Sequence, residues 1–589
     1  MIRRLLPYLK GYRKPAVIGP LLMVLEVACE LILPLLMANI IDKGINGGAG
    51  LSYILQQGIL MVVLACLSMF AGVMATKFTS QASMGFGANL RKGMFDKIQE
   101  FSFADIDRFS SASLITRMTN DVNALQMMVG MALRMLVRAP VMLVAALIVC
   151  VNINARLARV LFVVIPLMAI AVGTLMTFCH KLFGIMQKKI DNLNATVQEN
   201  LIAIRVVKAF VRMGYEKTKF KKSNDELTES SLRAVTRVIL MQPIMTISLY
   251  GAIVAVLWLG GNQVIVGDML VGDLSSFITY ISQILMSVLM LAMSLLQYTR
   301  AQACAQRIGE VFDTVPDIRD GEDAGNAALP ESRGKVEFKD VSFRYQATGT
   351  GDDVLSHIDL TIEPGEFVAI VGGTGVGKSS LVNLIPRFYD VTGGAVLVDG
   401  IDVREYPIEA LRERIGMVLQ TNVLFSGTIR DNLLWGNPDA TEEELIQAAK
   451  NAQAYDFIMS FPDGFDTWLE QGGVNVSGGQ KQRLCIARAM LRAPSILILD
   501  DSTSAVDTAT EAKIRASFKE NLAGTTVIII AQRISSVEHA DKIVVLDDDH
   551  VVGLGTHQEL LKTNAIYLYR VCFRQRHLAL EWHRSVCDQ

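Results

Sequence analysis

Two glycines, a lysine and a serine at fixed spacing mark a phosphate-binding loop. Gly372, Gly377, Lys378 and Ser379 follow the pattern G-x-x-x-x-G-K-S. An apolar run at 367–371 precedes the loop and a helix-forming segment follows it, which is the context that such a loop requires. Its backbone N–H groups can surround a polyphosphate at a helix N-terminus. Lys378 is predicted to reach the β- and γ-phosphates, and the Ser379 hydroxyl to ligate Mg²⁺.

Two carboxylates stand at the end of a second apolar run. Residues 494–499 read as a buried strand that ends in Asp500 and Asp501. In a domain with a phosphate-binding loop, an aspartate in this position holds Mg²⁺ directly or through water. Asp500 is therefore predicted as a metal ligand beside Ser379. The remaining loop residues predicted to contact nucleotide are Thr374, Gly375 and Ser380.

A second turn of small residues precedes that strand. Ser477, Gly478, Gly479 and Gln480 open a helical segment, and such a turn is another cradle for an anion. Ser-Gly-Gly-Gln just upstream of the aspartate strand resembles the signature of ATP-binding cassette (ABC) proteins. The resemblance implies that these four residues contact an ATP held by a facing cassette. It also implies a dimer that encloses ATP and Mg²⁺ between two cassettes.

Two further residues take their expected roles from the same resemblance. Tyr345 matches the aromatic residue that stacks on adenine, and the alternative is an ordinary strand tyrosine. Gln420, after the apolar run 415–419, matches the glutamine that reaches Mg²⁺ and links the cassette to the membrane domain.

Two positions depart from the family pattern, and both concern hydrolysis. The residue after the metal-binding aspartate is normally Glu, which orients the attacking water, and here it is Asp501. The segment after the next strand normally contains a histidine, and here Gln532 replaces it. Aspartate is one methylene shorter than glutamate, and catalytic geometry is sensitive to shifts of about 1 Å. Glutamine can donate a hydrogen bond to phosphate but cannot carry a positive charge. Asp501, Gln532 and Gln420 are therefore the predicted catalytic positions of a slow site.

The elements that must position these residues fall into two halves. The chain has 589 residues, of which 51% are hydrophobic and 19% are charged. Its first half contains six apolar stretches, each near the roughly 20 residues that span a bilayer. They cover residues 15–41, 51–76, 127–151, 157–178, 239–266 and 274–296. From residue 336 onward, short β-type runs alternate with helical segments, which is typical of an α/β domain. Residues 336–338 and 341–345 are predicted as an early strand pair.

The predicted fold is thus an α-helical transmembrane domain with six spans, followed by an α/β cassette with a phosphate-binding loop. The predicted boundaries are 1–310 for the transmembrane domain with its cytosolic helical extensions, 311–335 for a linker, 336–575 for the nucleotide-binding domain and 576–589 for a C-terminal tail.

The distribution of cations predicts the orientation in the cytoplasmic membrane. Lys and Arg are concentrated in residues 1–14 and in the long connections at 77–127 and 181–237. By the positive-inside rule, both termini lie in the cytosol. The long connections alternate apolar and charged residues at helical spacing, so we expect helices that extend into the cytosol. Their turns, near 103–111 and 202–210, are expected to touch the nucleotide domain, and they resemble the coupling helices of the family.

Two carboxylates lie inside the first span. Glu26 and Glu30 are one turn apart and share a face. They form either a polar wall of a substrate cavity or a structural pair bonded to neighbouring helices, and the sequence does not separate the two.

Six spans plus one cassette resemble an ABC exporter half-transporter of the type IV fold. The resemblance implies ATP-driven export of a hydrophobic or amphipathic substrate, a drug or a lipid, by alternating access. Because binding residues are intact while Asp501 and Gln532 depart, we expect one subunit of a heterodimer with a slow site. The alternatives are a homodimeric exporter of another substrate class and an ATP-gated regulatory or channel-like protein. The net charge of −2 gives no signal for nucleic acid.

Overall fold

The computed structural model of the chain describes residues 2–320, 329–345, 353–501, 506–522, 524–531 and 537–575. The chain divides into two compact units. Unit 1 comprises Met1–Gln99 and Ala112–Thr314, and unit 2 comprises Glu100–Ser111 and Val315–Gln589. A short segment from the first half of the sequence therefore belongs with the second half.

Unit 1 is helical. Its short N-terminal helices are α1 (Ile2–Leu5) and the 3-10 helix η1 (Leu6–Leu9). Six of its helical segments are long and apolar enough to cross a membrane. The elements are α2 (Arg13–Asn39), the π-helix η2 (Ile40–Asn46), α3 (Gly50–Gln99), α5 (Ser111–Thr116), the π-helix η3 (Arg117–Asp121), α6 (Val122–Ile153), α7 (Ala155–Ile202), α8 (Ile204–Ala209), α9 (Met213–Ile239), α10 (Met241–Val266) and α11 (Val271–Asp313).

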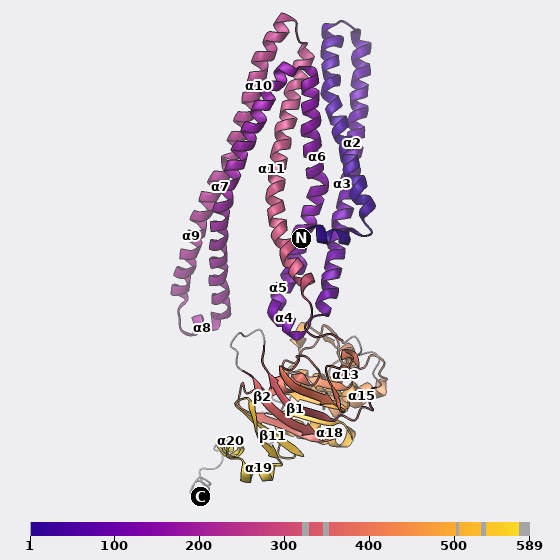
Figure 1. Cartoon of the computed structure of the whole chain (residues 1–589), viewed down its shortest axis with the longest axis vertical. Coiled ribbons are helices and arrows are strands. Elements are labelled where there is room, and N and C mark those ends of the chain that lie inside the picture. The colour runs from indigo at the N-terminus through magenta and orange to yellow at the C-terminus, as the bar shows by residue number, and fades with distance from the viewer. Residues whose placement is uncertain are drawn as a thin grey trace. The chain divides into compact units, whose positions relative to one another are not determined.

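The long helices pack lengthwise in unit 1. α2 runs along α3, α6 runs along α11, and α7 runs beside α9, with the short α8 joining their ends (Figure 1). The outward side chains of α3 include Ile59, Val62 and Phe70, all of which are exposed. Such a face suits lipid rather than water. The prediction that helices extend past the apolar stretches is confirmed, because α3 continues to Gln99 and α7 to Ile202.

Unit 2 contains a six-stranded sheet, a four-stranded sheet and a two-stranded sheet. The six-stranded order is β12-β11-β3-β10-β9-β6, the four-stranded order is β2-β1-β4-β5, and β7 pairs with β8. The strands are β1 (Val336–Phe343), β2 (Leu355–Ile362), β3 (Phe367–Gly372), β4 (Gly393–Val398), β5 (Ile401–Asp402), β6 (Ile415–Val418), β7 (Gly427–Thr428), β8 (Trp468–Leu469), β9 (Ile496–Asp500), β10 (Thr526–Ile530), β11 (Lys542–Asp547) and β12 (His550–Gly555).

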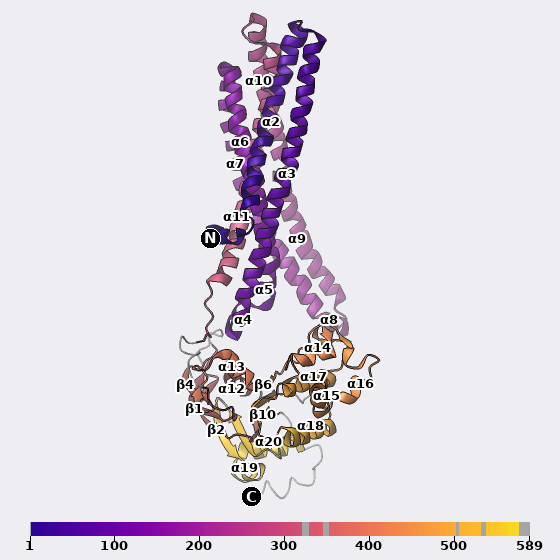
Figure 2. The same ribbon diagram turned by 90° about the vertical axis from the view of Figure 1, so that its right-hand side faces the viewer.

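Helices surround these sheets. They are α4 (Phe103–Phe109), α12 (Lys378–Leu384), α13 (Ile408–Glu413), α14 (Ile429–Leu434), α15 (Glu442–Asn451), α16 (Tyr455–Met459), α17 (Gly478–Leu491), α18 (Thr508–Asn521), α19 (His557–Thr563) and α20 (Ala565–Gln575), with the 3-10 turns η5 (Gly464–Asp466) and η6 (Gln471–Gly473). Figure 2 shows α14, α15 and α17 on one side of the unit and β1 and β4 on the other.

The six-stranded sheet separates two hydrophobic cores. In β9, Ile496 and Ile498 point into the core shared with β1, β2 and α12, whereas Leu497 and Leu499 point into the core shared with α17 and α18. Strands buried on both faces are continuous apolar runs, because neither face meets water. For this reason the apolar runs at 367–371 and 494–499 could be predicted as strands from the sequence. The predicted α/β class is confirmed.

One strand prediction was wrong. Residues 336–338 and 341–345 do not form a strand pair, because β1 runs through 336–343 as one strand between β2 and β4. Its pairing register shifts around Asp340, whose φ is +51°. A bulge adds one residue to a strand and breaks the alternation of faces. The break between the two predicted strands is therefore a bulge within β1.

Candidate functional site

Three parallel strands bring the chemistry-bearing residues to one edge of the six-stranded sheet. β10 lies between β3 and β9, and Ile530 pairs with Ile370 on one side and Asp500 on the other. The carboxyl ends of all three strands therefore meet at this edge, where open α/β sheets bind ligands. The phosphate-binding loop leaves β3 here, and Asp500 ends β9.

The loop between β3 and α12 requires glycine at two positions. Gly375 and Gly377 have φ values of +87° and +86°, in the left-handed region that glycine adopts without penalty. A Cβ on Gly377 would also lie 2.7 Å from the carbonyl oxygen of Val354. Gly377 precedes α12, so the loop residues lead directly into the helix N-terminus. The Lys378 ammonium donates to the carbonyl oxygens of Gly372 and Gly373 and therefore lies over the loop.

Ser379 and Asp500 form the predicted metal-binding pair. The Ser379 hydroxyl donates to Oδ1 of Asp500 at 3.0 Å, and Asp500 is only 4% exposed. Burial raises the pKa of the Asp500 carboxyl, and the nearby Asp501 adds to this effect, while the bond from Ser379 and the charge of Lys378 oppose it. One hydroxyl and one carboxylate are hard oxygen ligands, and Mg²⁺ usually takes one or two protein carboxylates plus phosphate oxygens. The two side chains therefore fit Mg²⁺ carried by a nucleotide.

Asp500→Asn should raise the thermal stability of the metal-free protein near neutral pH and abolish its stabilisation by Mg-ATP. The raised pKa means that the charged Asp500 carboxyl destabilises the fold at pH values above it. The gain from Asn should therefore shrink as the pH falls and Asp500 takes up a proton. Thermal unfolding in EDTA and in Mg-ATP, from about pH 4 to about pH 8, measures both effects. An asparagine variant that is equally stabilised by Mg-ATP would contradict the metal role.

Asp501 lies at the same edge with a constrained backbone. Its φ is +49°, and its N–H donates to the carbonyl oxygen of Ile530 at 3.2 Å. Aspartate is among the few non-glycine residues that occupy this region readily. Asp501 therefore stands next to the Asp500 and Ser379 pair, at the position predicted for water activation. Gln532 lies outside the residues that the structure describes.

Tyr345 lies next to the loop. Its hydroxyl is 3.0 Å from the Ser380 hydroxyl, so the predicted adenine platform is bonded to the first turn of α12. The rings of Phe343 and Tyr389 meet the Tyr345 ring nearly edge-on, at centroid distances of 4.8 Å and 5.1 Å. The prediction that Tyr345 and the loop form one site is consistent with these contacts.

The predicted signature residues form a helix start. Ser477 is the N-cap of α17, and its side chain accepts from the N–H of Gln480 while Oε1 of Gln480 accepts from the N–H of Ser477. This capping box explains why serine and glutamine stand three residues apart. It also leaves exposed Ser477 and Gly478 at the positive end of a 14-residue helix. Gln420 is exposed two residues after the end of β6.

Sequence reasoning missed the partner of the two intramembrane carboxylates. Arg138 on α6 donates through Nη1 to Glu26 at 2.6 Å and through Nη2 to Glu30 at 2.7 Å. We call Glu26, Glu30 and Arg138 the intramembrane triad. The structural alternative for the carboxylates, a pair bonded to a neighbouring helix, is thus supported. An arginine within an apolar span was the available signal, but its pairing depends on how α2 and α6 pack.

The fold and the site define an integral membrane protein that carries a P-loop nucleotide-binding domain. Residues 17–288 match the family described as "ABC transporter transmembrane region", and residues 355–504 match the family described as "ABC transporter". The chain therefore belongs to the ABC transporter family, as an exporter with its transmembrane and ATPase domains fused in one polypeptide.

Relatives align over nearly the full length. The chain is 39% identical over 566 residues to the uncharacterized ABC transporter ATP-binding protein YfiB of Bacillus subtilis, covering 96% of this chain and 97% of that one. It is 35% identical over 500 residues to the ATP-dependent lipid A-core flippase of Syntrophus aciditrophicus, covering 85% and 82%. A solved bacterial Atm1-family ABC exporter with ATP bound superposes with a TM-score of 0.80, at 25% identity, covering 95% of this chain and 98% of that one.

Proposed function

We propose that this ABC exporter moves a hydrophobic or amphipathic small molecule, a drug or a lipid, across the cytoplasmic membrane as one subunit of a heterodimer. It binds Mg-ATP at its own slow site and presents Ser477, Gly478, Gly479 and Gln480 to the hydrolytic site of the partner. Similar proteins carry names that fit such substrates. They include the lipid A-core flippase and a putative multidrug export protein, YgaD of Bacillus subtilis, at 32% identity.

The combination of Asp501 with intact binding residues carries the assignment of a slow site. Lys378, Ser379 and Asp500 retain the groups that hold phosphate and metal. Asp501 and Gln532, by contrast, replace the two residues that the family uses for hydrolysis. Phosphoryl transfer depends on positioning and electrostatics, so a displaced carboxylate slows the chemistry without weakening ATP binding. ATP bound at the slow site then favours the closed cassette pair through its higher affinity for that state.

Chain purified alone in lipid nanodiscs tests the slow site. We expect 8-azido-ATP to label the chain, with an affinity that falls when Lys378 is replaced. We also expect slow ATP hydrolysis, at a rate that Asp501→Asn leaves unchanged. Robust ATPase activity that rises with substrate and disappears in Asp501→Asn would overturn the proposal. Co-expression of two differently tagged copies tests the pairing, because a stable complex of the two tags indicates a homodimer.

Transport by the assembled pair separates export from ATP-gated regulation. Vesicles that contain the chain with its partner should move a fluorescent short-chain phospholipid or an amphipathic dye only with hydrolysable ATP. If the probe instead moves down its own concentration gradient when ATP binds without being hydrolysed, the result would favour the channel-like alternative.

A further inference from the structure

A five-residue segment shortly after the loop helix α12 contacts two other parts of unit 2. The segment Pro386–Asp390 begins two residues after the end of α12. Its aromatic residues, Phe388 and Tyr389, contact α4. Tyr389 also contacts Tyr345 in the candidate nucleotide site. The same short segment therefore touches both the predicted adenine platform and a helix from the first half of the chain.

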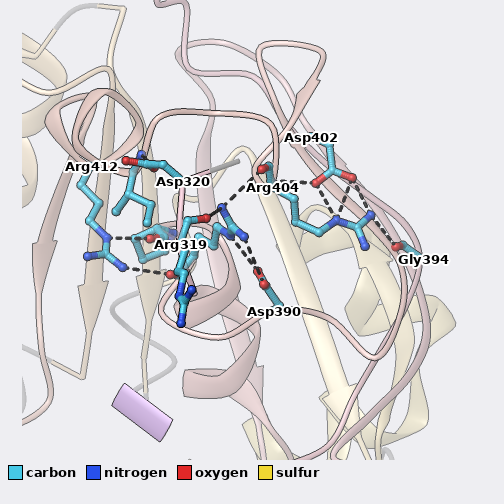
Figure 3. Close-up of polar contacts among 10 residues, drawn as sticks. Arg319, Asp320, Asp390, Gly394, Asp402, Arg404 and Arg412 are labelled. Atoms are coloured by element: carbon cyan, nitrogen blue, oxygen red, sulfur yellow. Dashed lines mark hydrogen bonds and ion pairs between the residues drawn. The ribbon is translucent and has the colours of Figure 1, made fainter. Parts of the chain in front are cut away.

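Two arginines fix the backbone of this segment. Arg387 is 6% exposed, pairs with Asp390 at 2.8 Å and donates to the carbonyl oxygens of Arg319 and Arg404. Arg412 donates to the carbonyl oxygens of Pro386 and Arg387 at 3.1 Å and 3.0 Å. Figure 3 shows Asp390, Arg412 and the carbonyl group of Arg319 gathered around this segment. Buried charge-assisted bonds of this kind restrict the backbone. The backbone that carries Tyr389 is thus held in one conformation.

Tyr389 holds the Tyr345 ring on one side. The two rings meet at 87° with their centroids 5.1 Å apart. Phe343 meets both rings, at 4.8 Å from Tyr345 and 5.7 Å from Tyr389. Edge-to-face aromatic pairs are favourable beyond the burial of their surface. The orientation of the Tyr345 ring therefore depends on Tyr389 as well as on the hydroxyl bond to Ser380.

The hydroxyl end of the Tyr389 side chain contacts α4. Its hydroxyl donates to Oδ2 of Asp107 at 3.1 Å. Phe103, one helical turn before Asp107, packs on Phe388 at 4.4 Å between centroids. Residues four apart share one helix face, so Phe103 and Asp107 dock together. The chain is continuous from α4 to α3 and α5 in unit 1.

We propose that Tyr389 is a positioning residue for the nucleotide base, which holds Tyr345 against adenine and couples its orientation to the docking of α4 through Asp107. The inference rests on the proposed stacking role of Tyr345. Base binding orders the Tyr345 ring, which favours one orientation of Tyr389 and hence the bond to Asp107. By linkage, docking of α4 strengthens base binding to the same extent.

Competition against 8-azido-ATP labelling of the full-length protein tests this proposal, with ATP and inorganic tripolyphosphate as competitors. Tyr389→Leu should weaken ATP about threefold to tenfold, the range of one aromatic pair, and leave tripolyphosphate unchanged. Tyr389→Phe, which keeps the ring but loses the bond to Asp107, should recover most of the ATP affinity. Phe388→Leu is the matched control, since its ring contacts α4 but not Tyr345 among the described contacts. It should change the affinity ratio of ATP to tripolyphosphate much less than Tyr389→Leu does, because it weakens only the docking of α4 and leaves the Tyr389 ring against Tyr345.

Hydrogen exchange of residues 100–111 tests the coupling. ATP should slow exchange there in the wild type, and Tyr389→Phe should lose this response while still binding ATP. Wild-type ATP affinity in Tyr389→Leu, or equal loss of ATP and tripolyphosphate, would overturn the positioning role. Retention of the exchange response in Tyr389→Phe would overturn the coupling. If Tyr345→Ala binds ATP normally, the stacking assignment itself fails, and that result is distinct from a failure at Tyr389 alone.

Discussion

Replacing Asp501 with Glu and Gln532 with His should raise ATP hydrolysis by the chain at least about tenfold. Glutamate carries its carboxylate one methylene further from the backbone, as the usual family residue does, and histidine can carry a positive charge that glutamine cannot. The binding residues are unchanged, so the Michaelis constant for ATP should move little while the turnover number rises. Steady-state ATPase assays in nanodiscs, at protein concentrations where copies can pair, measure both constants.

The backbone of Asp501 sets a modest limit on this gain. Glutamate is less suited than aspartate to a φ of +49°, with a cost of about 1 kcal/mol. Thermal unfolding of each variant shows whether this cost matters. Adding Lys378→Ala to the double variant should abolish the gain, and Asp501→Asn should stay slow. An unchanged rate in a double variant that still labels fully with 8-azido-ATP would show that the two departures do not limit hydrolysis.

Arg138→Met should destabilise the protein by about 3 kcal/mol, because it leaves two carboxylates unpaired between membrane helices. Glu26 and Glu30 are 12% and 27% exposed at their side chains, and both bond to the same guanidinium. Gly72 on α3 leaves room for the Glu26 carboxylate, since a Cβ there would lie 3.0 Å from its Cδ atom. Three helices therefore meet at the intramembrane triad, and losing its cation should lower the unfolding temperature in detergent.

Two variants make this prediction specific. Arg134 lies one turn before Arg138, is exposed, and donates only weakly to Gly130 at 3.4 Å. Arg134→Met should therefore cost much less. Replacing all three triad residues, by Glu26→Gln, Glu30→Gln and Arg138→Met, should recover most of the lost stability, because no charge remains unpaired. Equal losses in Arg134→Met and Arg138→Met would show that the triad contributes nothing specific.

Local sequence patterns predicted the strands, the loop and the long helices, because residues near each other in the chain determine these elements. Continuous apolar runs predicted β3 and β9, since these strands are buried on both faces. Glycine spacing predicted the loop after β3, because its backbone conformation excludes other residues at Gly375 and Gly377. Six apolar stretches predicted the long helices of unit 1.

Features that depend on tertiary packing were not predictable in the same way. The pairing of Arg138 with Glu26 and Glu30 joins residues more than 100 positions apart and depends on the packing of α6 on α2. The contact between Tyr345 and Tyr389 requires the path of the segment after α12. The bulge at Asp340 depends on a backbone φ of +51°, which the residue types around it did not predict.

Proline is unevenly distributed among the long helices of unit 1. α2, α6 and α7 each contain proline, whereas none is found within α3 or α11. α3 and α11 are also the helices whose chains lead directly into the two segments of unit 2. Proline weakens a helix at a defined point. α3, with 50 residues, is about 75 Å long. A tilt of about 5° about its centre would move each end by about 3 Å. We therefore expect α3 and α11, whose C-terminal ends lead into unit 2, to tilt as stiff rods, and bending to occur at the prolines of α2, α6 and α7.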